Sequence, residues 1–206
     1  NLTGSTGTVT VDGTGSTLAM GTGGLWVGNS GFGSLTLSNG ASLTSNGTDI
    51  ASSAASGGSS ATVQSGATWT DAAGISIGSD SPGSLAVRTG GRVSSTGLTA
   101  GIRGGGDGST VTVTGEGSAL NLSGRLTAGQ GGDAALVVTD HATVTTPDLL
   151  MGSAATGTAT VSAAGTLTSG NAVLGETSTG VGVITVTGAG SSWTANGTIT
   201  VGDTVL

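Results

Sequence analysis

Few residues in this 206-residue chain could do chemistry: one histidine, eleven acidic residues and four arginines. There is no cysteine, so a disulfide framework or a thiolate metal site is excluded. His141 stands where three equivalent segments have glycine (Gly40, Gly66 and Gly90), which favours a turn residue over a catalytic base. We therefore expect no catalytic triad, no metal ion and no cofactor.

The acidic residues are spread along the chain rather than clustered. Five of them recur in what is predicted to be the same turn: Asp80, Asp107, Asp133, Glu176 and Asp203. A ridge of carboxylates could bind Ca²⁺, but the tandem nonapeptide pattern of such sites is absent. Two carboxylates flanking a cleft could cleave a glycosidic bond. The sequence indicates no cleft, so we expect solvated turn residues and no enzyme.

All four arginines fall in two neighbouring segments, and the net charge is −7 with no lysine. This charge excludes the basic surface that nucleic acid requires. Alternation with apolar neighbours points Arg88, Arg92 and Arg125 outward. Such a patch could bind an anionic glycan, or the guanidinium groups could pair with nearby acids such as Asp80, Asp107 and Glu116.

The elements that hold these residues are repeats. Gly, Ser and Thr make up about half of the chain, and only 7% of the residues are charged, which by composition alone is typical of a flexible linker. Apolar residues nevertheless recur in a fixed frame. The segment 7–11 (GTVTV) has counterparts starting at residues 33, 59, 83, 109, 134, 157 and 182. The mean spacing is 25 residues, so eight repeats fill the chain.

Each repeat carries five apolar columns. One column runs through Val11, Leu37, Val63, Val87, Val113, Val138, Val161 and Val186. Apolar and polar residues alternate within each repeat, which predicts short strands with one buried face. One repeat cannot bury its apolar side alone, so neighbouring repeats must stack. We predict an all-β fold: a right-handed parallel β-helix (β-solenoid) of about eight coils of about 25 residues, forming a single segment over residues 1–206.

Two sets of outward residues could form an interaction surface. Trp26 lies between two inward residues, and Leu150 and Val173 occupy equivalent positions, so these three could form a binding or self-association strip, or be covered by a neighbouring segment. Threonines on the first strand of each repeat form a row that includes Thr8, Thr10, Thr36, Thr62, Thr110 and Thr112. The row resembles that of β-solenoid antifreeze proteins, although Ala86, Val137 and Val183 interrupt it.

Two longer segments carry a resemblance to a known family: residues 25–41 (LWVGNSGFGSLTLSNGA) and residues 186–193 (VTGAGSSW). They resemble repeats in the passenger regions of bacterial autotransporter proteins. The resemblance implies a right-handed parallel β-helix that is exported to the cell surface, or secreted, through a C-terminal barrel. It also implies that the chain is part of a longer passenger, and that any contact with a membrane is made by a barrel outside this chain.

We therefore expect a structural stalk and interaction surface that mediates adhesion or self-association at the bacterial outer membrane. The expected partners are a host or bacterial surface glycan, a surface protein or another copy of the chain. Two other functions fit the same fold. A polysaccharide-acting enzyme would show carboxylates clustered on adjacent coils of one face, and an ice-binding solenoid would show a flat threonine face.

Overall fold

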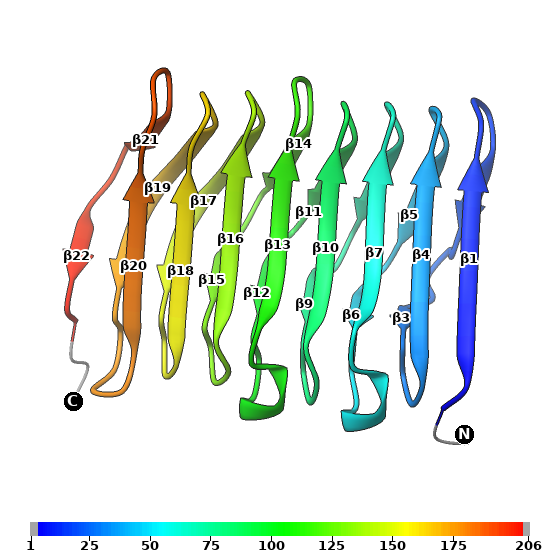
Figure 1. The fold of residues 1–206 in the computed structure, drawn as a ribbon, viewed down its shortest axis with the longest axis horizontal. Helices are drawn as coiled ribbons and strands as arrows, with labels where there is room; N and C mark the ends of the chain where they lie inside the picture. Colours follow the sequence, from blue (N-terminus) through cyan, green and yellow to red (C-terminus); the bar gives the residue numbers. More distant parts are fainter. Residues whose placement is uncertain (1–3, 204–206) are drawn as a thin grey trace.

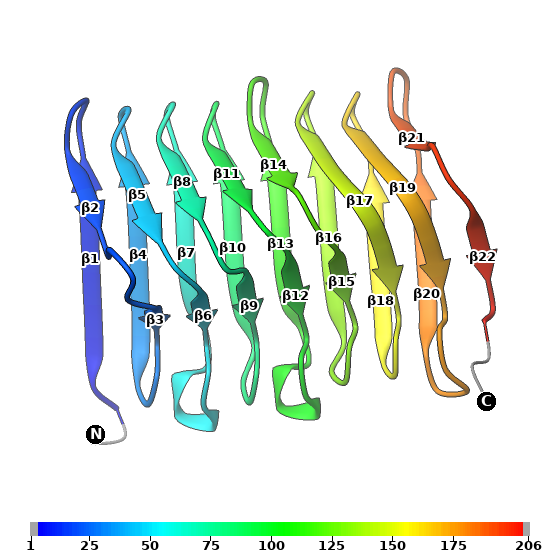
Figure 2. The same ribbon diagram turned by 180° about the vertical axis from the view of Figure 1, so that it is seen from behind.

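A computed structural model describes residues 4–203 as a β-solenoid of eight coils (Figure 1). In Figure 1 the front strands run upward while the chain advances from right to left, and Figure 2, seen from behind, shows the return strands running downward on the opposite side. The coil is therefore right-handed. Both the fold class and the number of coils predicted from the sequence are confirmed.

The front of every coil is one strand of an eight-stranded parallel sheet. In order, its strands are β1 (Thr6–Asp12), β4 (Phe32–Ser38), β7 (Ser59–Gln64), β10 (Gly83–Arg88), β13 (Ser109–Thr114), β16 (Ala134–Thr139), β18 (Thr156–Val161) and β20 (Val181–Val186). They average about six residues, because a glycine-containing turn follows the apolar pair in every coil except the sixth, where the turn is residues 139–142 (TDHA).

The back of each coil is two short strands separated by a bend (Figure 2). The strands before the bend are β2 (Thr17–Ala19), β5 (Ser42–Ser45), β8 (Thr68–Asp71), β11 (Arg92–Ser95), β14 (Ala119–Leu122) and β21 (Ser192–Ala195). Those after it are β3 (Leu25–Val27), β6 (Thr48–Ile50), β9 (Ile75–Ile77), β12 (Leu98–Ala100), β15 (Leu126–Ala128) and β22 (Ile199–Val201). In the sixth and seventh coils the two strands merge into β17 (Thr143–Met151) and β19 (Thr166–Leu174).

Strand pairing places the apolar columns in register, coil on coil. Val11 pairs with Leu37, and Leu37 pairs with Val63, so each column is a continuous apolar row along the axis. The interior between the front and back sheets is mostly apolar, and Trp69 is only 1% exposed within it. The fourth apolar column, counted along each repeat, lies directly after the bend of the back. It runs through Leu25, Ile75, Leu98, Leu126, Leu149, Ala172 and Ile199, and only in the second coil does it have a polar residue, Thr48, which pairs with Leu25. In the first and last coils the same columns are more exposed, Val201 by 73%, since they have a described neighbour on one side only.

One interior position is polar and contains a buried carboxylate. Asp71 is 2% exposed, and its Oδ2 accepts hydrogen bonds from Ser45 Oγ (2.6 Å) and Thr48 Oγ1 (2.7 Å). Its Oδ1 accepts from the backbone N–H groups of Gly74 (2.6 Å), Ala73 (3.0 Å) and Gly47 (3.3 Å). Burial by itself would raise the pKa of Asp71, but these hydrogen bonds to the ionised form outweigh it and hold the pKa below its usual value of 3.8.

Two of the connections from the back to the front sheet contain a short 3₁₀ helix, η1 (Ala54–Ser56) and η2 (Gly104–Gly106). Each is followed by a buried serine, Ser59 or Ser109, in the column where most other coils have glycine. Ser109 Oγ donates to Gly106 O (2.7 Å) and accepts from Gly83 N (3.3 Å). A Cβ at Gly78, whose φ is +73°, would overlap Ser109 Oγ, so the serine needs this glycine.

Candidate functional site

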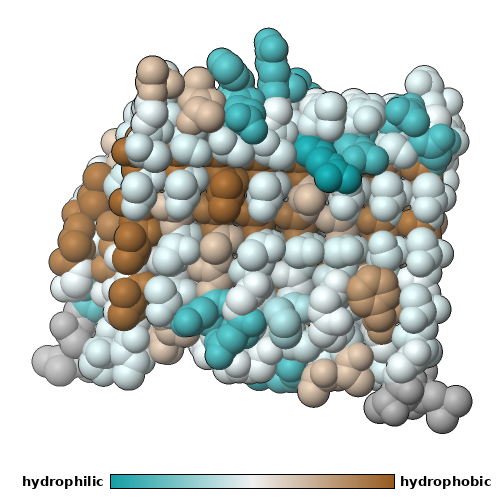
Figure 3. Space-filling model, in the orientation of Figure 1, coloured by the Kyte–Doolittle hydropathy of each residue, from teal (hydrophilic) through white to brown (hydrophobic). Residues whose placement is uncertain are grey.

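The front sheet presents two outward columns along the whole rod. Pairing places the first column as Thr8, Ser34, Ser60, Ser84, Thr110, Ala135, Thr158 and Val183, and the second as Thr10, Thr36, Thr62, Ala86, Thr112, Val137, Thr160 and Thr185. We call these sixteen residues the hydroxyl face. Twelve carry a hydroxyl group and none is charged, and Figure 3 shows the strongly hydrophilic side chains above and below these rows rather than within them. The face repeats at about 4.8 Å from one strand to the next.

The hydroxyl face contains all six threonines predicted as interaction residues (Thr8, Thr10, Thr36, Thr62, Thr110 and Thr112). The interruptions seen in the sequence lie within it as well: Ala86 is flanked by Thr62 and Thr112 on the adjacent strands. Its hydroxyl groups can each donate and accept a hydrogen bond. The face offers repeated polar contacts and no arrangement for acid–base chemistry.

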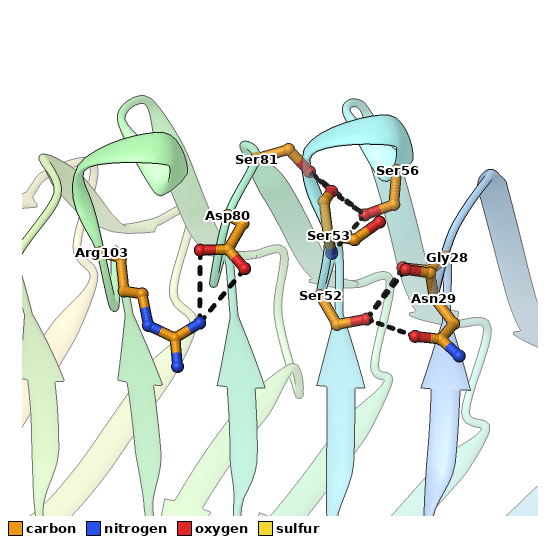
Figure 4. A network of polar contacts seen from close by, with 8 residues as sticks. All are labelled: Gly28, Asn29, Ser52, Ser53, Ser56, Asp80, Ser81 and Arg103. Atoms are coloured by element: carbon orange, nitrogen blue, oxygen red, sulfur yellow. Dashed lines mark hydrogen bonds and ion pairs between the residues drawn. The ribbon is translucent and has the colours of Figure 1, made fainter. Parts of the chain in front are cut away.

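The arginines do not form one patch. Arg88 and Arg92 flank the turn between β10 and β11, and Arg88 Nε donates to Gln64 Oε1 (2.8 Å). Arg103 follows β12 in the opposite turn and forms an ion pair with Asp80 (3.2 Å), extending from one coil to the preceding one as Figure 4 shows. Arg125 lies in the bend of the back, just before β15. The basic patch considered from the sequence is thus divided among three places on the rod.

The turns that carry the acidic residues form a hydrogen-bonded ridge instead of a metal site. Asp107 Oδ1 accepts from Asp133 N (2.8 Å), and Asp133 Oδ1 accepts from Thr156 N (2.7 Å), so each carboxylate caps the backbone of the next coil. Figure 4 shows the same ridge closer to the N-terminus, where Ser81 Oγ donates to Ser53 O (2.7 Å). Within residues 4–203, no three His, Asp or Glu side chains lie close enough together to hold a metal ion.

His141 lies in an exposed turn with φ of +64°, and its predicted place in a turn is confirmed. The left-handed backbone explains why glycine stands at the equivalent positions of other coils.

Trp26, Leu150 and Val173 lie in one outward-facing row, on the strands that follow the bend of the back. Pairing places Trp26, Asp49, Ser76, Thr99, Thr127, Leu150, Val173 and Thr200 in one row. Trp26 is 58% exposed, in agreement with its predicted direction. Leu150 is only 5% exposed, so of the two alternatives that the sequence left open, cover by neighbouring residues holds for Leu150. It points away from the core, but Thr127 and Val173 flank it on the adjacent strands and the surface is hollow at this point.

A polar ladder, which the sequence analysis missed, forms the wall of this hollow. At the position just before the fourth apolar column, the first four coils have glycine (Gly24, Gly47, Gly74 and Gly97) and the last four have Arg125, Asp148, Asn171 and Thr198. Asn171 Nδ2 donates to Asp148 Oδ1 (3.2 Å), and Asn171 Oδ1 accepts from Thr198 N (3.1 Å). The change from glycine to polar residues could have been seen in the sequence.

Beside the ladder lies a pocket of about 200 Å³, lined by Arg125, Asp148, Leu149, Leu150, Asn171, Val173 and Glu176. Glu176 reaches it from the turn after β19, and its Oε2 accepts from Ser153 Oγ (2.6 Å). Two carboxylates from adjacent coils therefore share one pocket with a guanidinium group and an apolar floor. The expectation that no cleft lies beside the acidic residues was wrong, because a cavity depends on the shape of the coil. Two carboxylates on adjacent coils of one face are the feature that the polysaccharide-acting alternative predicts.

Comparison with known proteins gives no relative for this chain: no family model, no curated protein and no solved structure matches it. Among residues 4–203, no helix is long and apolar enough to span a membrane.

Proposed function

We propose that the chain is a rigid, non-catalytic stalk and interaction surface of an autotransporter-like bacterial surface protein, acting in adhesion or self-association. The observation that carries this proposal is the hydroxyl face: eight strands in register present two uncharged columns of mostly Thr and Ser. Such a face repeats the same polar contact from coil to coil. A partner with a matching repeat, such as a glycan, an extended protein surface or a second copy, can contact several coils at once.

Stiffness makes this arrangement effective. Seven ladders of parallel strand pairing hold the eight front strands in fixed register, so the hydroxyl groups lose little freedom when a partner binds. A single hydrogen bond contributes about 0.5–1.5 kcal/mol net. Linked weak contacts act together once the first has formed, since the others then become intramolecular. Adhesion therefore needs no deep pocket on this face.

Placement at the bacterial cell surface, or release from it, belongs to the same proposal. It is supported by the resemblance of residues 25–41 and 186–193 to passenger repeats and by the solenoid fold that this resemblance implied.

The test introduces charge into the hydroxyl face. In the variant Thr36→Glu/Thr62→Glu/Thr112→Glu, three like charges stand in one column, and a partner that packs against this column must bury them. A matched control places the same charges in the outward column of the back strands, as Thr44→Glu/Thr70→Glu/Thr145→Glu. Thermal unfolding of both triple variants verifies that they fold.

We expect bacteria that display the front variant to clump and adhere at least tenfold less than those displaying the control. Sedimentation of the purified wild type, the two triple variants and Trp26→Ser then separates self-association from adhesion. If the front variant adheres and clumps like the control, the hydroxyl face is not the interaction surface. If wild-type cells neither clump nor adhere, the proposed function as a whole is wrong.

A further inference from the structure

We propose that the pocket beside the polar ladder is a binding subsite for one neutral sugar unit of a linear glycan that lies along the back of the solenoid. The pocket is on the face opposite to the hydroxyl face, so this inference does not depend on the proposed function. Its polar residues are Arg125, Asp148, Asn171 and Glu176, and its floor is Leu150 with Val173.

Three of the four polar groups of the pocket are held in place by hydrogen bonds before any ligand binds. Asn171 is fixed between Asp148 Oδ1 and the backbone N–H of Thr198, and Glu176 is fixed by Ser153. In these contacts each carboxylate uses one oxygen, which leaves the other as an acceptor. The Arg125 side chain is exposed and forms no hydrogen bond or ion pair with any residue in the described range 4–203. Asp148, Asn171 and Glu176 are therefore preorganised and bind a ligand at a low cost in side-chain entropy, whereas Arg125 must become ordered on binding.

The combination of groups matches the chemistry of a sugar ring. Neighbouring hydroxyl groups on a ring can donate to a carboxylate and accept from a guanidinium group at the same time. The C–H face of the same ring is apolar and can pack on the partly exposed Val173, beside the small exposed part of Leu150 on the adjacent strand. A pocket with an apolar floor and a few converging polar groups is the usual form of a small-molecule site.

The charges favour a neutral ligand over an anionic one. Arg125 contributes one positive charge, whereas Asp148 and Glu176 contribute two negative charges. A carboxylated or sulfated sugar would therefore meet net repulsion in the pocket, apart from its contact with Arg125.

The surface continues from the pocket toward the N-terminus, as a linear polymer requires. A second hollow of about 350 Å³ shares Arg125 and is lined by Gly74, Ser76, Gly97 and Thr99, among others. Gly74 and Gly97 occupy the ladder position here and have no side chain that could fill the hollow. Trp26 lies on the same row, five coils from Leu150, which is about 24 Å at the usual strand spacing. Its exposed ring offers a second apolar platform for a sugar.

An extended peptide fits this surface less well. Peptides that bind to sheets add a strand to a free edge, where backbone N–H and C=O groups are unpaired. The floor of the pocket belongs to β17 and β19, which pair with each other in register, so their backbone groups here are already engaged.

The experiment is a calorimetric titration of the 206-residue chain with four neutral hexasaccharides: cello-, chito-, malto- and mannohexaose. Arg125→Ala and Asp148→Ala are compared with two controls remote from the pocket, Arg92→Ala and Glu116→Gln. We expect at least one hexasaccharide to bind with a Kd of about 0.1–1 mM. Both pocket variants should weaken this binding at least tenfold, and the two controls should leave it unchanged. Thermal unfolding shows whether each variant is folded.

Three results would overturn the proposal: no binding of any hexasaccharide at about 10 mM, binding that persists in both pocket variants, or stronger binding of polygalacturonate or heparin than of every neutral probe. The front variant described above serves as a further control. It should bind the hexasaccharide like the wild type, so failure of the sugar site and failure of the adhesive face are separate outcomes.

Discussion

Removal of the buried Asp71 carboxylate should lower the free energy of unfolding, because the groups that donate hydrogen bonds to it lose their acceptor. In Asp71→Ala, five donors lose their acceptor. The hydroxyls of Ser45 and Thr48 are already within 3.2 Å of each other and can pair. Three backbone N–H groups are left without an acceptor, and each unsatisfied group lowers the free energy of unfolding by roughly 1–2 kcal/mol. We expect the free energy of unfolding to fall by about 3–5 kcal/mol.

The variant Asp71→Asn separates charge from shape. Its amide oxygen can still accept from the three backbone N–H groups, but its NH₂ group faces the two hydroxyls and the charge assistance is gone. We expect a loss of about 1–2 kcal/mol at pH 7. Because the pKa of Asp71 is lowered in the folded protein, its contribution to stability is present above the unfolded pKa near 3.8 and is lost as pH falls through the folded pKa. The difference between wild type and Asp71→Asn should therefore shrink below about pH 4.

The measurement is urea unfolding at several pH values between 7 and 2, with midpoint and slope recorded together, because a stacked repeat protein can lose coils one at a time. Asp140→Asn serves as the control, since this exposed carboxylate accepts from only one side chain, Thr114 Oγ1 (2.8 Å). Its effect should stay within about 0.5 kcal/mol. The reasoning is refuted if Asp71→Ala unfolds at the same urea concentration as the wild type. It is also refuted if the difference in free energy of unfolding between wild type and Asp71→Asn is the same at pH 3 and pH 7.

Gly78→Ala should lower the free energy of unfolding by about 2–4 kcal/mol, because its Cβ overlaps Ser109 Oγ and its φ is positive. Adding Ser109→Gly should recover part of the loss and leave about 1 kcal/mol of backbone strain, so additive effects in urea unfolding would contradict the packing argument. Leu120→Ala, in the middle of the core, should cost about 2.5–4 kcal/mol in the same assay, and a loss below 1 kcal/mol would mean that the core rearranges. Finally, cooled solutions of the protein should show no thermal hysteresis, because Ala86 and Val137 interrupt the hydroxyl columns; arrested growth of ice crystals would instead support ice binding.

The architecture could be predicted from the sequence because it depends on periodicity. The spacing of Val11, Leu37 and Val63 determines which residues face inward, and strand pairing then follows without long-range information. The same logic identified Val63 as an inward residue and Trp26 as an outward one. These are consequences of alternation along single strands, which a sequence shows directly.

The candidate sites depend on shape, which alternation does not describe. Leu150 has the parity of an outward residue, yet neighbouring residues cover it and leave it only 5% exposed. The four arginines are close in sequence but lie at three places around the coil, since 25 residues travel once around the rod. The ladder of Arg125, Asp148 and Asn171 was visible as an aligned position, but its significance required the pocket that Glu176 closes from another turn.

The direction of the strand pairing has a mechanical consequence. Hydrogen bonds between coils run along the axis of the rod, so a force that pulls the two ends apart acts along these bonds and breaks the ladders one after another instead of all together. The solenoid should resist bending and compression but unravel under tension, coil after coil, from the less stable end. Each released coil of about 25 residues would lengthen the tether by about 80–90 Å. A solenoid of this design can yield stepwise under shear and recoil when the load falls.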